Sequence, residues 1–379
     1  MYIFKVELKK VINIPMLWIF LVLCLVFNVF IIMTGNYDAK WVNYVSQTSL
    51  VTGQRMGSEY SNLLAQLPDS QYRTAIHSQT TGSKNTFEDY KTSDLADIYI
   101  NLIGLTGTLA EQMKAKYVRL QPVINEMSDN GVSMDFYVGE LTYEHFGKLF
   151  RGIFKSILTE SILFAVLVML YLLGYESQNK TELLVYSTKT GRQVVRTKVL
   201  AGLLMGIVGF ILLCGISLTV FFTVYDYSGI WNANVSSQFN YIVEGLFRKP
   251  FMTWHSFTVW QYLLATILLS LILITVFSLF SMVLGLLIRN TYISFLIFIA
   301  LNMGMMTLPF VLSSISKYAF FLSENTPISL WYYQSLWFTE AGGLALWPWF
   351  ESIGVTIWLL LLGALGWCAI RYFYRRDLV

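Results

Sequence analysis

The sequence predicts an all-α polytopic membrane protein with six transmembrane helices, an N-terminal interfacial helix and a small, mainly helical extracellular domain. Two observations predict this class. Of the 379 residues, 55% are hydrophobic and only 13% are charged, which is about half the charged fraction of a soluble domain. The apolar residues also form continuous runs rather than alternating ones, and this pattern favours membrane helices over a β-barrel.

Six apolar runs are long enough to cross a bilayer. They occupy residues 16–33, 153–174, 199–224, 257–288, 292–312 and 352–372. The basic residues near their ends all fall on one side if the spans alternate. Because Lys and Arg in short loops mark the cytoplasmic side, we expect a multi-pass protein of the plasma membrane with both termini in the cytoplasm. The chain then divides into an interfacial helix (1–15), the first span (16–34), an extracellular domain (35–150) and five further spans (151–379).

Residues 1–15 have a different pattern from the spans. Tyr2, Ile3 and Val6 interleave with Lys5 and with further charged residues. This spacing predicts a short amphipathic helix in the cytoplasmic interface of the membrane. The alternative is a simple cytoplasmic extension of the first span.

Two polar or mixed segments lie outside the membrane in this topology. In residues 35–150, apolar residues recur at helical spacing between 94 and 127, and Thr92 begins a plausible helix start. Residues 313–350 are rich in Phe, Trp and Tyr. We expect this second segment to re-enter the outer leaflet, with its aromatic rings at headgroup depth.

The residues needed for several kinds of chemistry are missing from the sequence. No P-loop motif occurs, so we expect no ATP site of that type in this chain. The three His residues are far apart, which argues against a metal site, and the net charge of +3 says nothing about nucleic acid. We therefore expect no cofactor in this chain. Glu160 is the one acid in a span; it either serves transport or gating, or pairs near the membrane surface.

The polar island at residues 175–198 lies between the second and third spans. It carries five basic residues against Glu176 and Glu182, which places it in the cytoplasm. We expect two short helices here, at 181–186 and 192–198. Leu183 and Leu184 are unfavourable in water, so they either fill a groove of a partner or pack under the bundle.

The island follows the pattern Glu176-x5-Glu182-Leu-Leu-x-x-Ser187-Thr-x-x-x-Arg192-x-x-x-Arg196-x-Lys198. With this loop, its six spans and its large first outer segment, the chain resembles the membrane subunits of type-2 ABC transporters over nearly its whole length. The resemblance implies that the island is a coupling helix, which seats in a groove of an ATPase subunit. It implies these ATPase-coupling residues: Glu176, Glu182, Leu183, Leu184, Arg192 and Arg196.

The resemblance also implies partners and a substrate path. Two cytosolic ABC ATPase subunits would hold ATP and Mg, and a second permease, the same or homologous, would complete the transporter. Hydrolysis would not reside in this chain. An amphipathic, peptide-like or lipid-like substrate or drug, as in antimicrobial resistance, would move outward past the second and fifth spans. The residues expected on this path are Phe164, Leu167, Asn302 and Met305.

Other functions stay open at this point. The chain could be a membrane sensor or scaffold that binds peptide antibiotics or partners through its extracellular domain without transport. A secondary carrier would need acidic relays in the membrane, and the spans are almost free of charge. Asn302 could equally form an ordinary hydrogen bond between helices, with the nearby Met residues as packing.

Overall fold

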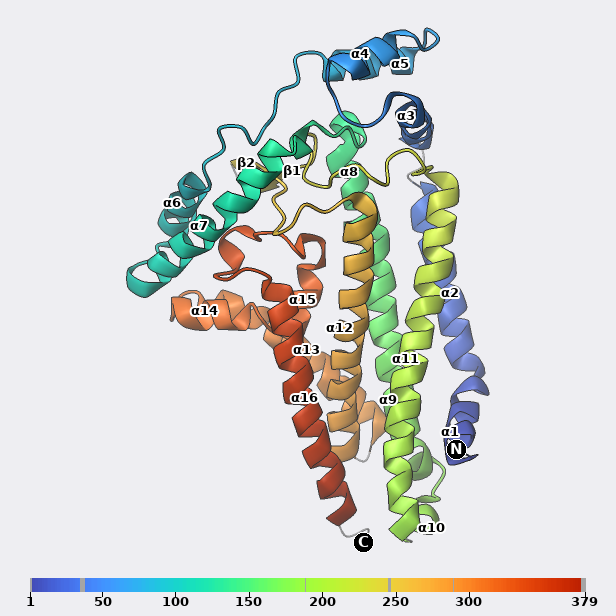
Figure 1. The fold of residues 1–379 in the computed structure, drawn as a ribbon. Coiled ribbons are helices and arrows are strands. Elements are labelled where there is room, and N and C mark those ends of the chain that lie inside the picture. Colours follow the sequence, from blue (N-terminus) through green and yellow to red (C-terminus); the bar gives the residue numbers. More distant parts are fainter. Residues whose placement is uncertain (1, 35–37, 188, 245–246, 289, 376–379) are drawn as a thin grey trace.

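A computed structural model of the chain describes residues 2–34, 38–187, 189–244, 247–288 and 290–375. Within these residues, six helices are long and apolar enough to cross a membrane (Figure 1). The predicted all-α polytopic fold is therefore confirmed. The six helices are α2 (Pro15–Thr34), α9 (Phe154–Gln178), α11 (Lys189–Val224), α12 (Val259–Leu287), α13 (Thr291–Leu312) and α16 (Phe350–Arg375).

Helices α9, α11 and α12 form the centre of the bundle, and α2, α13 and α16 pack around them (Figure 1). Small residues bring α11 close to α9. A methyl group added at Gly206 would lie 2.8 Å from the Cβ of Ala165, so only glycine allows this approach. By contrast, most of α2 and α13 is exposed and apolar, which suits contact with lipid or with another membrane protein.

The two ends of the bundle differ (Figure 1). Helix α1 (Tyr2–Ile12), helix α10 (Glu182–Tyr186) and the end of α16 lie at one end, which we call the terminal end. Residues 2–12 form a helix separate from α2. Its exposed side carries Tyr2 and Ile3, while Glu7 and Val11 are buried against the bundle. The predicted second short helix of the island is wrong: residues 192–198 are the first turns of α11, which begins at Lys189.

The opposite end, the domain end, carries a folded layer built from three segments: 38–153, 225–258 and 313–350. We expected only the first as a domain. The second contributes an antiparallel hairpin to the layer and was not predicted. Asp135 connects the first two segments, because its carboxylate accepts hydrogen bonds from Arg55 at 2.5 Å and from the backbone of Asn234 at 3.0 Å.

The layer consists of the long helix α7, several shorter helices, single turns and one antiparallel strand pair. Its elements are α3 (Ala39–Thr52), α4 (Ser58–Ala65), α5 (Gln71–Thr80), α6 (Thr92–Ile103), α7 (Gly107–Asp129), η2 (Val132–Met134), η3 (Gly139–Leu141), α8 (Thr142–Phe146), the π-helical turn η4 (Gly147–Ile153), β1 (Tyr241–Glu244), β2 (Phe247–Pro250), α14 (Lys317–Ser323), α15 (Pro327–Tyr332), η5 (Gln334–Leu336) and η6 (Gly342–Leu344). The predicted start at Thr92 is confirmed. Helix does not continue from 94 to 127, because Gly104 adopts a left-handed conformation with φ of 69° and ends α6.

Burial explains much of the aromatic content of residues 313–350. Trp337, Phe338 and Phe321 are buried inside the layer, whereas Tyr318 and Leu322 of α14 are exposed. Many of the rings that we expected at headgroup depth are therefore core residues.

The second span continues directly into the layer. Helix α8, turn η4 and helix α9 form one helical rod from the domain end to the terminal end (Figure 1). The π-helical turn adds an extra residue to one turn at the junction, a feature that is frequent at functional sites.

Candidate coupling surface and membrane cavity

Helix α10 presents an apolar pair at the terminal end. The exposed fractions of Leu183 and Leu184 are 65% and 79%, and Glu182 beside them is half-buried. The structure thus places these leucines on the surface rather than under the bundle. Exposed apolar residues on a short helix are suited to insertion into a groove of another protein.

A cluster of buried charges supports α10 from behind. We call it the inner node, and it consists of Glu7, Lys10, Glu176, Tyr186 and Lys198. The carboxylate of Glu176 accepts hydrogen bonds from Lys10 at 3.0 Å, from the hydroxyl of Tyr186 at 3.1 Å and from Lys198. Lys10 also pairs with Glu7 at 2.8 Å. Burial raises the pKa of Tyr186, so its hydroxyl stays protonated and continues to donate.

The inner node joins four helices, because Lys10 lies on α1, Glu176 on α9, Tyr186 on α10 and Lys198 on α11. Glu176, which we expected to contact an ATPase directly, is only 2% exposed. Its place in the structure is that of a residue that positions α10. The local sequence around Glu176 does not reveal its partners, since Lys198 lies 22 positions and Lys10 lies 166 positions away along the chain.

The two arginines of the expected coupling set face the end of α16. Arg192 donates to the carbonyl oxygens of Tyr186 at 3.2 Å and of Tyr374 at 2.5 Å. The guanidinium of Arg196 lies 5.5 Å from the ring centroid of Tyr374. Both side chains are therefore directed towards α16 rather than towards the exposed tip of α10.

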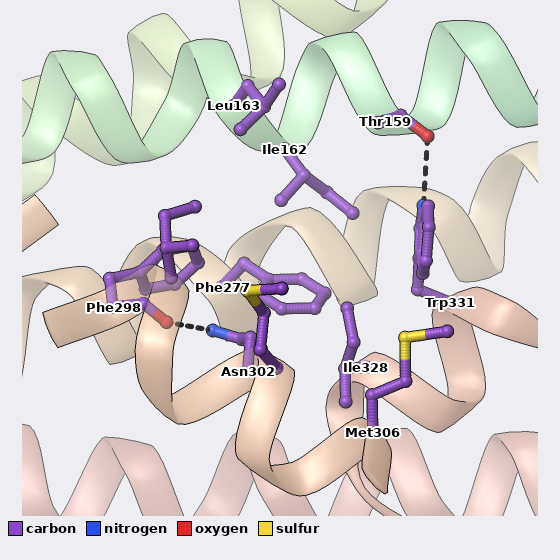
Figure 2. A pocket seen from close by; sticks show the side chains of 11 residues that line it. Thr159, Ile162, Leu163, Phe277, Phe298, Asn302, Met306, Ile328 and Trp331 are labelled. Carbon is purple, nitrogen blue, oxygen red and sulfur yellow. Dashed lines mark hydrogen bonds between the residues drawn. The ribbon is translucent and has the colours of Figure 1, made fainter. Parts of the chain in front are cut away.

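A cavity of about 180 Å³ lies between α9, α12, α13 and α15 (Figure 2). Its walls are almost wholly apolar, as expected for a site for an apolar group. They are formed by Thr159, Ile162, Leu163, Phe277, Phe298, Ile299, Asn302, Met303, Met306, Ile328 and Trp331. The indole of Trp331 donates to the hydroxyl of Thr159 at 3.0 Å and fixes α15 against α9 (Figure 2).

Of the four residues expected on the substrate path, the structure places one on this cavity. Asn302 lines it, whereas Phe164, Leu167 and Met305 do not. Phe164 instead packs against Gly209 of α11 and stacks on Phe20 of α2 with ring centroids 6.5 Å apart. One residue turns a helix by about 100°, so the cavity face of α9 carries Ile162 and Leu163 in place of Phe164.

Asn302 is the polar residue of α13 at the cavity, and only 6% of it is exposed. Its amide nitrogen donates to the carbonyl oxygen of Phe298 at 2.8 Å (Figure 2). Among the described residues its amide oxygen finds no donor. The bond to Phe298 lies within α13, so Asn302 does not join two helices as an ordinary interhelical bond would.

Glu160, the acid of the second span, joins a polar cluster in the membrane. Its carboxylate accepts hydrogen bonds from the amide of Asn28 at 2.8 Å and from the hydroxyl of Ser156 at 3.1 Å. Asn28 also donates to Ser217 at 3.2 Å, so the cluster ties α2, α9 and α11 together. Its contacts are those of a helix-packing residue.

A second buried charge cluster lies at the domain end. We call it the outer node, and it consists of Glu340, Lys116, Lys249, Tyr99 and Tyr117. Glu340 pairs with Lys249 and accepts from Tyr117 at 2.7 Å, and its carboxylate lies 3.8 Å from Lys116. Burial would raise the pKa of Glu340, but the two lysines outweigh it and the pKa lies below its usual value.

No group of three His, Cys, Asp or Glu side chains that could hold a metal ion occurs within the described ranges. Comparisons of the chain with models of protein families, with curated proteins and with solved structures found no match. The function is therefore argued from the geometry of α10, the inner node and the cavity.

Proposed function

We propose that the chain is the permease half of an ATP-driven exporter of the type-2 ABC kind. It would work with two ATPase subunits and a second permease, the same or homologous. The terminal end would face the cytoplasm and the domain end the outside of the plasma membrane. The observation that carries the proposal is the exposed pair Leu183 and Leu184 on a short helix that the inner node connects to the bundle.

The inner node gives that helix a mechanical connection to the bundle. A push on α10 reaches α9 through the bond from Tyr186 to Glu176 and reaches α11 through the pair of Glu176 with Lys198. Helix α9 continues through η4 and α8 into the domain-end layer. A movement started at α10 would therefore act on both ends of the second span.

The cavity favours an apolar or amphipathic substrate. Its walls are aliphatic, aromatic or thioether side chains, and Met303 and Met306 can adapt to ligands of different shape. A single unpaired amide oxygen on Asn302 would suit one hydrogen-bond donor on the substrate. Peptide-like and lipid-like molecules and many drugs meet both requirements.

The test replaces Leu183 and Leu184 together by Asp. The chain is co-expressed with the ABC ATPase encoded nearest to its gene, and co-purification and ATP turnover are measured. A carboxylate in an apolar groove should cost on the order of 2 kcal/mol or more per residue. Both readouts should therefore fall sharply.

The matched control is Leu102→Asp. Leu102 is 66% exposed on α6 at the domain end, so the substitution makes the same exchange, one charge in place of two, at a similarly exposed leucine far from α10. The control variant should assemble normally. Unchanged assembly and ATP turnover in the Leu183→Asp, Leu184→Asp variant would contradict the proposal.

A further inference from the structure

A cleft of about 430 Å³ opens at the terminal end, between the first turn of α11 and the last turn of α16. Ser187, Arg192, Gln193 and Tyr374 line it. Each of these four side chains can donate a hydrogen bond, and none is a carboxylate. The cleft is thus suited to an anion.

Arg192, the arginine that lines the cleft, has N–H donors that no described group accepts from. Arg192 uses two of its five N–H groups on carbonyl oxygens, at 3.2 and 2.5 Å. Arg196 lies over the ring of Tyr374. In the part of the chain that the structure describes, no carboxylate pairs with either arginine. The hydroxyl of Tyr374 is also buried without a described partner.

The depth of the cleft along α16 matches lipid headgroups. The guanidinium of Arg371 lies 3.5 Å from the ring centroid of Trp367, an arrangement that places both at the membrane interface. Tyr374 follows Arg371 by one turn, or about 4.5 Å along the axis. The headgroup layer is roughly 5–7 Å thick on each side, so the cleft opens within it.

We propose that this cleft binds the phosphate of an anionic phospholipid, with Arg192 in its lining and Arg196 nearby, over the ring of Tyr374. Basic pockets between membrane helices at the cytoplasmic face suit such headgroups, because that leaflet carries negative lipid. The proposal goes beyond transport and does not depend on an ATPase contact. It also gives Arg192 and Arg196 a ligand of the right charge.

The experiment uses the purified full-length chain in detergent. Short-chain phosphatidylglycerol, short-chain phosphatidylcholine and inorganic phosphate are titrated separately, and the shift in unfolding temperature gives each apparent affinity. Phosphatidylglycerol should stabilise the protein at concentrations where the other two have no effect. Arg192→Gln should weaken its binding about tenfold, as expected for a lost charged hydrogen bond.

Arg192 also holds two carbonyl oxygens, so its replacement could disturb the fold. Gln193→Glu avoids this difficulty, because Gln193 is exposed in the cleft and the change leaves the bonds of Arg192 intact. The added carboxylate should weaken the binding of phosphatidylglycerol about tenfold, because it repels the phosphate. Gln193→Lys should strengthen this binding. Gln66→Glu, at an exposed residue of the domain end, is the matched control and should bind as the parent does.

Three results would each overturn the proposal. Equal affinity for phosphatidylglycerol and phosphatidylcholine would remove the headgroup preference. Saturation by inorganic phosphate at the same concentration would make the cleft a site for free phosphate. Unchanged phosphatidylglycerol binding in Gln193→Glu would place the bound lipid outside the cleft.

Discussion

Each end of the bundle contains a glutamate buried between two lysines. At the terminal end Glu176 lies between Lys10 and Lys198, and at the domain end Glu340 lies between Lys116 and Lys249. Both carboxylates are at most 3% exposed. The two nodes therefore carry a similar desolvation cost, and they differ in how the lysines are held.

The outer node is fixed by the backbone. Lys116 donates to the carbonyl oxygens of Glu340, Gly342 and Ala345, and the amide of Gly342 donates back to the Glu340 carboxylate at 2.6 Å. The inner node depends mainly on bonds between side chains, and Lys10 there has the second carboxylate of Glu7. The outer node thus locks the domain-end layer into one body. The inner node joins helices through groups that can exchange partners, as a joint that transmits movement requires.

Breaking the outer node should have the largest effect on stability. Glu340→Gln removes the carboxylate that pairs with Lys249 and lies 3.8 Å from Lys116, while both lysines stay buried. Loss of one partner of a buried pair costs about 3–5 kcal/mol. We expect a correspondingly lower unfolding temperature in detergent, with the domain-end layer becoming sensitive to protease first.

Glu140→Gln is the control for this variant, because Glu140 is an exposed glutamate of the same layer. It should unfold like the parent protein. If Glu340→Gln were also as stable as the parent, the outer node would not lock the layer.

Breaking the inner node should cost less stability but more function. In Glu176→Gln, Lys10 keeps Glu7 and Lys198 keeps the carbonyl oxygen of Leu172 at 2.6 Å. We expect a loss of about 2 kcal/mol. Substrate-dependent ATP turnover of the assembled complex should be lost while co-purification of the ATPase persists, because Leu183 and Leu184 remain exposed.

The control is Glu182→Gln, because Glu182 lies on α10 but outside the inner node. This variant should keep the stability of the parent. Normal turnover in Glu176→Gln would show that the node only stabilises the fold.

The sequence predicted the membrane helices well, because a span needs a long apolar run and such runs are visible without knowing any contact. Helix α2 begins within one residue of its expected start, and α13 begins one residue earlier than expected. The sequence did not predict how the domain-end layer is assembled. That layer combines segments that lie far apart along the chain: Tyr117 and Glu340, which are hydrogen-bonded, are 223 positions apart.

The candidate sites show the same limit. The exposed pair Leu183 and Leu184 could be identified from the sequence, since apolar residues in a charged loop contradict their surroundings. The inner node could not, because nothing in the local pattern pairs Lys10 with Glu176. The family resemblance implied both Asn302 and Phe164 for the substrate path, and of these two Asn302 lines the cavity. Phe164 does not line it, because the packing of α11 through Gly209 decides which face of α9 meets the cavity.

A pH series would sharpen the comparison within the domain end. Burial raises the pKa of Glu324 to about 7, and the hydroxyl of Tyr333 opposes that shift only in part. A carboxyl with a raised folded pKa contributes stability below about pH 4.5 and loses it as the pH rises through about 7. Glu340, whose pKa is lowered, behaves oppositely, and its contribution to the stability of the folded protein is lost as the pH falls.

We expect Glu324→Gln to stabilise the protein by about 2 kcal/mol at pH 8 relative to pH 5. If the difference in stability between Glu324→Gln and the parent were the same at pH 5 and pH 8, the raised pKa of Glu324 would be contradicted.

The smallest effect on stability should come from the buried polar residue that lies between the two nodes. Asn302 is uncharged, and its one described bond is to Phe298 within its own helix, so Asn302→Leu removes a single hydrogen bond together with an unpaired acceptor. These terms nearly cancel, and we expect a change in stability below about 1 kcal/mol.

The effect of Asn302→Leu on transport should be larger if the cavity holds substrate. The apparent affinity for a substrate with an N–H or O–H donor should fall about tenfold, while the apparent affinity for a substrate without a donor should stay unchanged. Met305→Ala, one turn further along α13 but outside the cavity lining, is the matched control and should preserve both affinities. Equal affinities for both kinds of substrate in Asn302→Leu and the parent would leave Asn302 as a packing residue.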